Sequence, residues 1–209
     1  MDTRKQIASY LLQSKAIKLE PATPFTWASG WKSPIYCDNR KTLSYTRIRD
    51  FIRDSFVENI LNIHPDVEVI AGVATGAIAQ GALVADKLKL PFVYVRSEAK
   101  SHGLENLIEG VISPGLKVVI IEDLISTGGS SLKAVKALRD SGCIVLGMLA
   151  IFTYGFPQAK NNFLEANCTV TTLSDYDSLL ELALETNFIT SSQQKILREW
   201  RLDPENWMK

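Results

Sequence analysis

Short apolar runs without polar alternation constrain this sequence more than any other feature. Four of them are Val69–Val73, Phe92–Val95, Val118–Ile121 and Ile144–Phe152, and Cys168–Leu173 is a weaker fifth. A strand that is apolar at every position is buried on both faces, which is typical of parallel sheets covered by helices on both sides. Segments with helical spacing lie between the runs. We therefore expect an α/β fold, an open parallel sheet flanked by helices.

The same periodicity sets the expected organisation of the chain. At 209 residues we predict a single domain, with an N-terminal helical and irregular segment (1–65), an α/β core (66–175) and C-terminal helices (176–209). Thr190 and Gln193 have capping-box spacing before the last helix. The predicted helices are Ile7–Leu12, Ile48–Leu61, Ile78–Leu88, Leu132–Leu138, Ala159–Ala166, Leu179–Leu184 and Lys195–Trp200.

Charge and cysteine content exclude several classes of protein. The chain has 23 Lys+Arg and 23 Asp+Glu and no basic block, which argues against a dedicated nucleic-acid binder. Its longest uncharged stretches, Val69–Ala85 and Cys143–Ala159, contain Gly and Gln and are shorter than the roughly 20 residues of a membrane-spanning helix. The three cysteines form no CxxC motif, so we expect reduced thiols in a cytoplasmic protein.

The segment Val118–Ser130 carries the strongest chemical signal. An apolar run ends at two carboxylates, Glu122 and Asp123, and a turn rich in hydroxyl groups and glycine precedes the next helix. The first N–H groups of a helix lack partners and attract anions, and Gly128 and Gly129 allow the backbone to approach a phosphate closely. The segment therefore predicts a phosphosugar site, with phosphate on the helix end and sugar hydroxyls on the acids.

Other motifs narrow the type of site. The chain has neither a G-x-x-x-x-G-K-[ST] motif nor a G-x-G-x-x-G motif, so a P-loop and a dinucleotide fold lack support. Gly72–Gly76 is a second strand-to-helix turn able to receive an anion. From Ser97 to Gly110 the chain is polar, as in many functional lids. Arg96, Lys100 and His102 supply cationic groups there for a polyphosphate.

Three segments together resemble a known family. Val118–Ser130 resembles the phosphoribosyl-pyrophosphate (PRPP) signature of the type I phosphoribosyltransferases. Arg96–Gly103 with Ile108–Gly110 resembles the mobile catalytic loop of the orotate phosphoribosyltransferases. Phe25–Asp38 resembles their N-terminal hood, with its Ser-Gly…Ser-Pro-x-Tyr pattern. The resemblance implies a parallel α/β core with a small hood within residues 1–65.

The resemblance also implies a reaction. Orotate and PRPP would give orotidine 5′-monophosphate and pyrophosphate in pyrimidine (UMP) biosynthesis, with Mg²⁺ held mainly by PRPP and water rather than directly by protein. It implies a homodimer in which the catalytic loop reaches the neighbouring subunit's site, and neither a nucleic-acid nor a membrane partner.

Site residues follow from the same resemblance. Lys100, His102, Glu122 and Asp123 are implied to be catalytic, and orotate to lie beside Ser126 and stack on Tyr36. The implied PRPP-binding residues are Thr75, Arg96, Lys100, His102, Glu122, Asp123, Leu124, Ile125, Ser126, Thr127, Gly128, Gly129 and Ser130.

This sequence departs from the family pattern at two positions. Many relatives carry a lysine where Thr75 stands and another where Ala28 stands. Their absence would place more of the electrostatic stabilisation of pyrophosphate on Arg96, Lys100 and His102.

Two other interpretations remain open at this point. A purine or xanthine phosphoribosyltransferase would share the PRPP segment but arrange its hood and lid differently. A non-catalytic PRPP-binding regulator would need a nucleic-acid-binding module or a basic surface, and elution with nucleic acid at low salt would reveal it.

Overall fold

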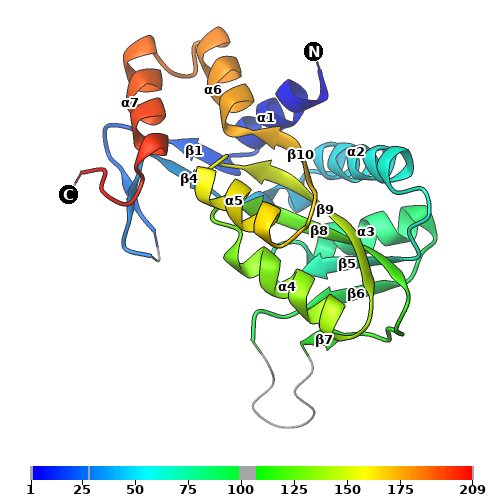
Figure 1. Ribbon diagram of the computed structural model, residues 1–209. Helices are drawn as coiled ribbons and strands as arrows, with labels where there is room; N and C mark the ends of the chain where they lie inside the picture. Colours follow the sequence, from blue (N-terminus) through cyan, green and yellow to red (C-terminus); the bar gives the residue numbers. More distant parts are fainter. Residues whose placement is uncertain (1, 28, 99–106, 209) are drawn as a thin grey trace.

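The computed structural model, which describes residues 2–27, 29–98 and 107–208, has a six-stranded sheet at its centre (Figure 1). Five strands are parallel, as expected, and β7 runs antiparallel to its neighbour β6. The polar segment from Ser97 to Gly110, which we compared with a functional lid, nevertheless contributes a core residue near its end, since Ile108 in β7 is 4% exposed. In spatial order the strands are β10 (Val170–Asp175), β9 (Ile144–Thr153), β8 (Lys117–Ile125), β5 (Val69–Val73), β6 (Phe92–Val95) and β7 (Ile108–Glu109).

Helices cover both faces of this sheet (Figure 1). Side chains of β8 alternate between two apolar clusters, as a strand's period of two requires. Val119 and Ile121 join the cluster that contains α1, α2, α3, α6 and α7, whereas Val118 and Ile120 join the cluster that contains α4 and α5. The sheet is therefore buried on both sides. The helices over the sheet are α2 (Thr46–Ile63), α3 (Ile78–Leu88), α4 (Gly129–Asp140) and α5 (Pro157–Glu165).

The N-terminal segment contains more regular structure than the sequence indicated. Besides α1 (Thr3–Gln13), it forms two small antiparallel sheets and a 3₁₀ helix, η1 (Asn39–Ser44). Strands of two or three residues are too short to produce a periodicity, which is why we predicted none here. The sheets pair β1 (Ile17–Leu19) with β4 (Ile35–Cys37), and β2 (Phe25–Thr26) with β3 (Lys32–Ser33).

Two helices close the fold at the C-terminal end, α6 (Tyr176–Glu185) and α7 (Ser191–Leu202). The predicted capping box of α7 is present, with Thr190 and Gln193 in reciprocal hydrogen bonds. Trp200 of α7 is fully buried, and its indole N–H donates to the carbonyl of Lys32 in β3 (3.1 Å). Its ring lies 5.6 to 5.8 Å from four other aromatic rings, those of Trp27, Tyr154, Phe156 and Tyr176.

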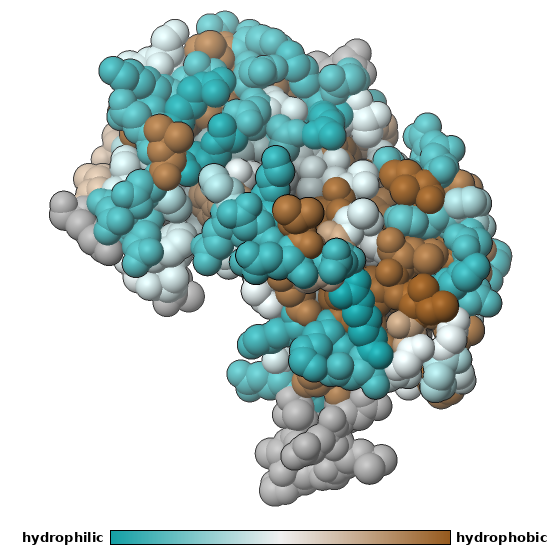
Figure 2. Space-filling model, in the orientation of Figure 1, coloured by the Kyte–Doolittle hydropathy of each residue, from teal (hydrophilic) through white to brown (hydrophobic). Residues whose placement is uncertain are grey.

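The visible surface reflects amphipathic helices. Figure 2 is mostly hydrophilic over the helices, and its hydrophobic side chains gather on the right of the view. On α4, for example, Val135 and Leu138 are buried while Lys133 and Lys136 are exposed. Among the described residues, no helix has the length and apolar character to cross a membrane. All three cysteines are free thiols.

Candidate active site

The acid pair lies within the final residues of β8 rather than after the strand. We expected the strand to end at Ile121, but it continues to Ile125. Pairing with β5 stops at Ile121, whereas pairing with β9 continues to the end of β8. Glu122 and Asp123 are consecutive strand residues, so their side chains point to opposite faces of the sheet.

Glu122 points toward α4 and is 3% exposed. The hydroxyl of Ser131 in α4 donates to its Oε2 (2.7 Å), and the N–H of Asp123 donates to its Oε1 (2.9 Å). Burial raises the pKa of Glu122 to about 8, and the adjacent charge of Asp123 adds to the effect. Glu122 thereby ties the end of β8 to the first turn of α4.

Asp123 points to the opposite face, toward the turn between β5 and α3. A Cβ on Gly76 in that turn would collide with the Asp123 carboxylate, so only glycine permits this approach. Burial raises the pKa of Asp123, and hydrogen bonds to its carboxylate offset this only in part. No ion pair joins it to a described Lys or Arg. The Asp123 carboxylate is thus half-buried and close to the backbone, and within the described residues it is influenced by the charge of Arg40 without forming an ion pair.

The turn from β8 to α4 leaves a helix N-terminus available. Gly128 is the N-cap, has φ +84°, and supplies no side-chain cap to α4. The turn is braced from α5, where the Asn162 side-chain amide donates to the Thr127 carbonyl (2.9 Å) and Phe163 packs against Gly128. Unsatisfied N–H groups and a helix dipole make this turn suited to an anion.

A cavity of about 420 Å³ lies at the C-terminal ends of β5 and β6. Arg96 lines it and contacts Glu109 of β7 (Nη1 to Oε1, 3.4 Å). Thr75 lies in the same wall, and its peptide bond with Ala74 is cis. In the sheet, β5 has β6 on one side and β8 on the other. Such a reversal of strand order is a topological switch point, and open α/β sheets bind ligands there. The cavity is lined by Ala74, Thr75, Ile78, Tyr94, Arg96, Ser97 and Glu109.

A second cavity, of about 220 Å³, lies between the N-terminal segment and the end of β8. Half of its lining residues are aromatic, and it brings together Tyr36 and Ser126, which are distant in the sequence. We call it the aromatic cavity. Asp123 lines neither cavity, but its carboxylate lies against Gly76, the neighbour of Thr75 in the first, and its own neighbour Leu124 lines the second. The lining residues are Trp27, Tyr36, Cys37, Leu124, Ser126 and Tyr154.

A larger cavity, of about 640 Å³, lies between α5 and β10. Its lining is mainly apolar, and Lys160 is the one charged residue among the described residues around it. Glu122 and Asp123 line none of the three cavities. We assign the candidate site to the two smaller ones because Thr75 and Arg96 line one and Tyr36 and Ser126 line the other. The Asp123 carboxylate lies against Gly76, next to Thr75.

Comparison with known proteins decides the family. The model of the phosphoribosyl transferase domain matches residues 39–171. An orotate phosphoribosyltransferase of Porphyromonas gingivalis is 63% identical over 203 residues, 97% of this chain and 97% of that protein. The chain belongs to the orotate phosphoribosyltransferase family.

Other orotate phosphoribosyltransferases agree over the whole length. That of Listeria monocytogenes serotype 4b is 54% identical over 209 residues, 100% of both chains. The crystal structure of orotate phosphoribosyltransferase from Aeropyrum pernix has a TM-score of 0.77 at 26% identity, covering 88% of this chain and 99% of that one. The resemblance inferred from the three motifs and the expected fold are thus confirmed.

The structure brings together most residues that the resemblance to orotate phosphoribosyltransferases indicated. Thr75 and Arg96 share one cavity, and Tyr36 and Ser126 share the other. The predicted site residues on β8 and on the turn between β8 and α4 are consecutive, and they form one continuous strip, residues 122–130. Lys100 and His102, together with Ala28, lie outside the described residues. The roles of all these residues stay predictions.

Sequence reasoning missed the residues that hold this strip in place. Asn39, Ser131 and Asn162 each make a side-chain hydrogen bond to it. Only Ser131 gave a signal, because it follows the turn directly. The two asparagines lie 84 and 35 residues away from their partners, and no pattern in a single sequence links positions so distant.

Proposed function

We propose that this chain transfers the 5-phosphoribosyl group of PRPP to orotate, giving orotidine 5′-monophosphate and pyrophosphate. The observation that carries the proposal is that two unlike cavities flank the end of β8. The Asp123 carboxylate lies against the Gly76 turn, whose Thr75 lines one cavity, and Leu124 and Ser126 line the other. One cavity contains Arg96 and a backbone turn, which suit pyrophosphate, and the other is aromatic, which suits a flat base. In the reaction, the ribose C1 atom must exchange one of these groups for the other.

The 5′-phosphate binds the turn between β8 and α4. Thr127, Gly128, Gly129 and Ser130 cradle it with backbone N–H groups and hydroxyls, and Leu124 and Ile125 complete the strip that PRPP covers. This arrangement holds one end of the substrate at a fixed distance from Asp123, and such positioning supplies a large part of the rate enhancement when two substrates must meet.

The acid pair serves the ribose. As pyrophosphate leaves, positive charge develops at C1, and fixed negative charge nearby stabilises it. Asp123 accepts hydrogen bonds from the ribose hydroxyls through its half-buried carboxylate. Glu122 acts through its bonds to Ser131 and to the N–H of Asp123, since both of its oxygens are engaged inside the chain.

Cations neutralise the leaving group. Arg96 faces the cavity proposed for pyrophosphate, and Lys100 and His102 add positive charge from the loop that follows it. Closure of that loop excludes water, which would otherwise hydrolyse PRPP. We infer from the family that the loop acts in the site of a second copy of the chain, so that the working form is a homodimer.

Orotate occupies the aromatic cavity. The Tyr36 ring stacks on the pyrimidine, and the Ser126 hydroxyl hydrogen-bonds an edge of the base. Behind them Tyr154 is 2% exposed, and its ring lies 5.2 Å from that of Trp27. A rigid aromatic wall of this kind supports a stacked base at low entropic cost.

Magnesium accompanies PRPP rather than residing in the protein. Mg²⁺ keeps several waters and takes few protein ligands when phosphate oxygens are present. Asp123, an oxygen donor beside the proposed pyrophosphate cavity, is the residue able to meet the hydrated ion. The ion would neutralise charge on the leaving group.

We infer a cytoplasmic setting for this reaction. Its support is the free state of Cys37, Cys143 and Cys168, which suits a reducing compartment.

The test follows orotate consumption by ultraviolet absorbance with PRPP and Mg²⁺, with hypoxanthine, xanthine, uracil and adenine as parallel bases. We expect turnover with orotate alone. If only a purine base is turned over, that base and not orotate is the substrate, and the proposed function must be changed accordingly. PRPP binding without turnover of any base would favour the non-catalytic regulator. Against a regulator stands the similarity to an orotate phosphoribosyltransferase over 97% of this chain.

A further inference from the structure

Asn39 links the two walls of the proposed site from a buried position. It is the first residue of η1, separated from β4 by one residue, and is 2% exposed. Its side-chain Nδ2 donates to the backbone carbonyl of Asp123 (2.6 Å), and its Oδ1 accepts from the Cys37 thiol (3.3 Å). Cys37 lines the aromatic cavity. The Asn39 amide therefore connects Cys37, in the wall of the aromatic cavity, to the backbone of Asp123 in β8.

The bond to Asp123 fills a gap in the sheet. Hydrogen bonding along a parallel strand alternates between its two neighbours, and Ile121 is the last residue of β8 paired with β5. Asp123, two residues on, directs its carbonyl to the same side, where the described strand pairings offer no further partner. Asn39 supplies the missing donor. The backbone of Asp123 is thus held by a side chain of the N-terminal segment.

Asn39 is itself held in place. The Thr42 hydroxyl, fully buried, donates to the Asn39 carbonyl (2.6 Å). Burial raises the pKa of the Cys37 thiol well above its usual value, so the thiol keeps its proton and remains a donor. Both hydrogen bonds of the Asn39 side chain are therefore maintained at neutral pH.

We propose that Asn39 is a positioning residue that sets the direction of the Asp123 carboxylate relative to the base cavity. This inference rests on the proposed function. The amide of Asn162 braces the same segment at Thr127, four residues further on, from α5. The two amides act on different parts of the substrates: Asn39 on the ribose and base, and Asn162 on the 5′-phosphate.

The experiment compares steady-state kinetics of Asn39→Ala and Asn162→Ala with the wild-type chain. For Asn39→Ala we expect kcat to fall about 10- to 100-fold, because a displacement of about 1 Å has effects of this size. The KM for orotate should rise more than the KM for PRPP. Asn162→Ala should show the opposite split, raising the KM for PRPP more than that for orotate.

Two further variants separate positioning from folding. Asn59→Ala removes the same kind of bond, from Nδ2 to the Ser55 carbonyl (2.8 Å), on α2 and away from the site. Its kinetics should match the wild type. Cys37→Ala leaves Asn39 in place but removes its thiol donor, and should shift the KM for orotate in the same direction as Asn39→Ala, by a smaller factor. This variant keeps the test available if Asn39→Ala does not fold.

Several outcomes would overturn the inference. A folded Asn39→Ala with kcat within twofold of wild type would do so, as would an identical KM pattern for Asn39→Ala and Asn162→Ala. If Asn39→Ala does not fold, an unchanged KM for orotate in Cys37→Ala has the same meaning. A wild-type chain that fails to turn over orotate would instead refute the proposed function, and the two failures are therefore distinguishable.

Discussion

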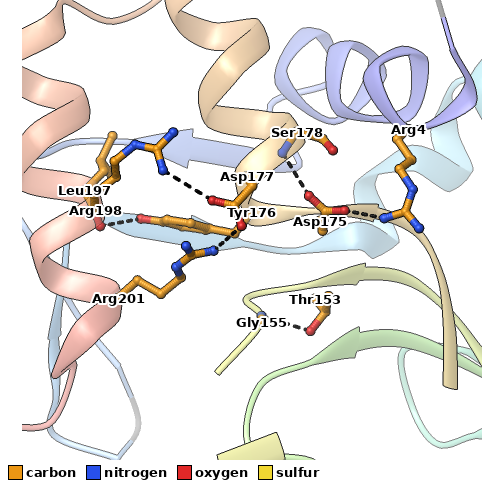
Figure 3. Close-up of polar contacts among 10 residues, drawn as sticks. All are labelled: Arg4, Thr153, Gly155, Asp175, Tyr176, Asp177, Ser178, Leu197, Arg198 and Arg201. Atoms are coloured by element: carbon orange, nitrogen blue, oxygen red, sulfur yellow. Dashed lines mark hydrogen bonds and ion pairs between the residues drawn. The ribbon is translucent and has the colours of Figure 1, made fainter. Parts of the chain in front are cut away.

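β8 and β10 both carry acidic residues near their C-terminal ends, and a helix follows each strand, yet the chain uses these acids differently. After β10, Asp175 caps α6 by accepting from the N–H of Ser178 (2.8 Å), and it forms an ion pair with Arg4 (Figure 3). Burial alone would raise the pKa of Asp175, but these contacts hold it below its usual value. Near the end of β8, by contrast, burial raises the pKa values of Glu122 and Asp123.

The neighbouring helix ends differ in the same way. The N-terminus of α6 is capped by Asp175, and Asp177 in its first turn pairs with Arg198 and Arg201 of α7 (Figure 3). The N-terminus of α4 has Gly128 as its N-cap and no side-chain cap. At the end of β10, the acidic side chains and the helix N–H groups are paired within the chain, and the arrangement is structural. We infer that the end of β8 is a binding site, because there the charge and the N–H groups of α4 are left for a ligand.

The largest effect should distinguish the two acids directly. Asp123→Asn removes the charge beside the proposed ribosyl cation, and we expect kcat/KM to fall about 10²- to 10³-fold, as when other preorganised charge-stabilising groups are removed. Asp175→Asn is the matched control, because Asn is also a good N-cap. It should leave kcat/KM within twofold and lower the unfolding free energy by about 1 kcal/mol or less. Equal kinetic effects of the two changes would show that the acids of β8 are structural.

Gly76→Ala tests the same contrast without altering any charge. The added methyl group must push the Asp123 carboxylate aside, and we expect kcat/KM to fall about 10- to 100-fold through misplacement. The measurement is the assay above, with thermal unfolding to verify the fold. Ser55→Ala, on α2, is the control and should match the wild type. Wild-type kinetics in a folded Gly76→Ala would mean that the position of the carboxylate is unimportant.

The smallest effect concerns pH. The folded chain retains a proton on Glu122 that the unfolded chain releases above about pH 4.5, so its contribution to stability falls as pH rises toward about 8. One proton limits this slope to about 1.4 kcal/mol per pH unit. Asp175 behaves oppositely, since its contribution is present above its unfolded pKa of 3.8 and is lost as pH falls.

Denaturant unfolding from pH 5 to 8 measures the difference. Glu122→Gln should flatten the decline that the wild type shows over this range, and Asp175→Asn should leave it unchanged. A wild-type curve with no such decline, or a Glu122→Gln curve that declines equally, would contradict a raised pKa at Glu122.

Sequence reasoning reached the core of the fold because buried parallel strands have a distinctive composition. It also reached the family, since motifs such as Val118–Ser130 are local. It treated Glu122 and Asp123 as equivalent because it ended the strand at Ile121. Had the strand been extended to Ile125, its alternation would have separated their faces. The brace from Asn39 depends on tertiary packing, so local pattern contains no trace of it.

Trp200 has a consequence for the order in which the site can be assembled. The base cavity is lined by Trp27 and Tyr154, and Trp200 packs against both and bonds to Lys32 in the N-terminal segment. During synthesis the N-terminal segment emerges from the ribosome first and α7 last. The wall of the cavity proposed for the base therefore cannot be complete until α7 has been synthesised, whereas the residues proposed to bind the sugar and the phosphate precede α7 in the chain.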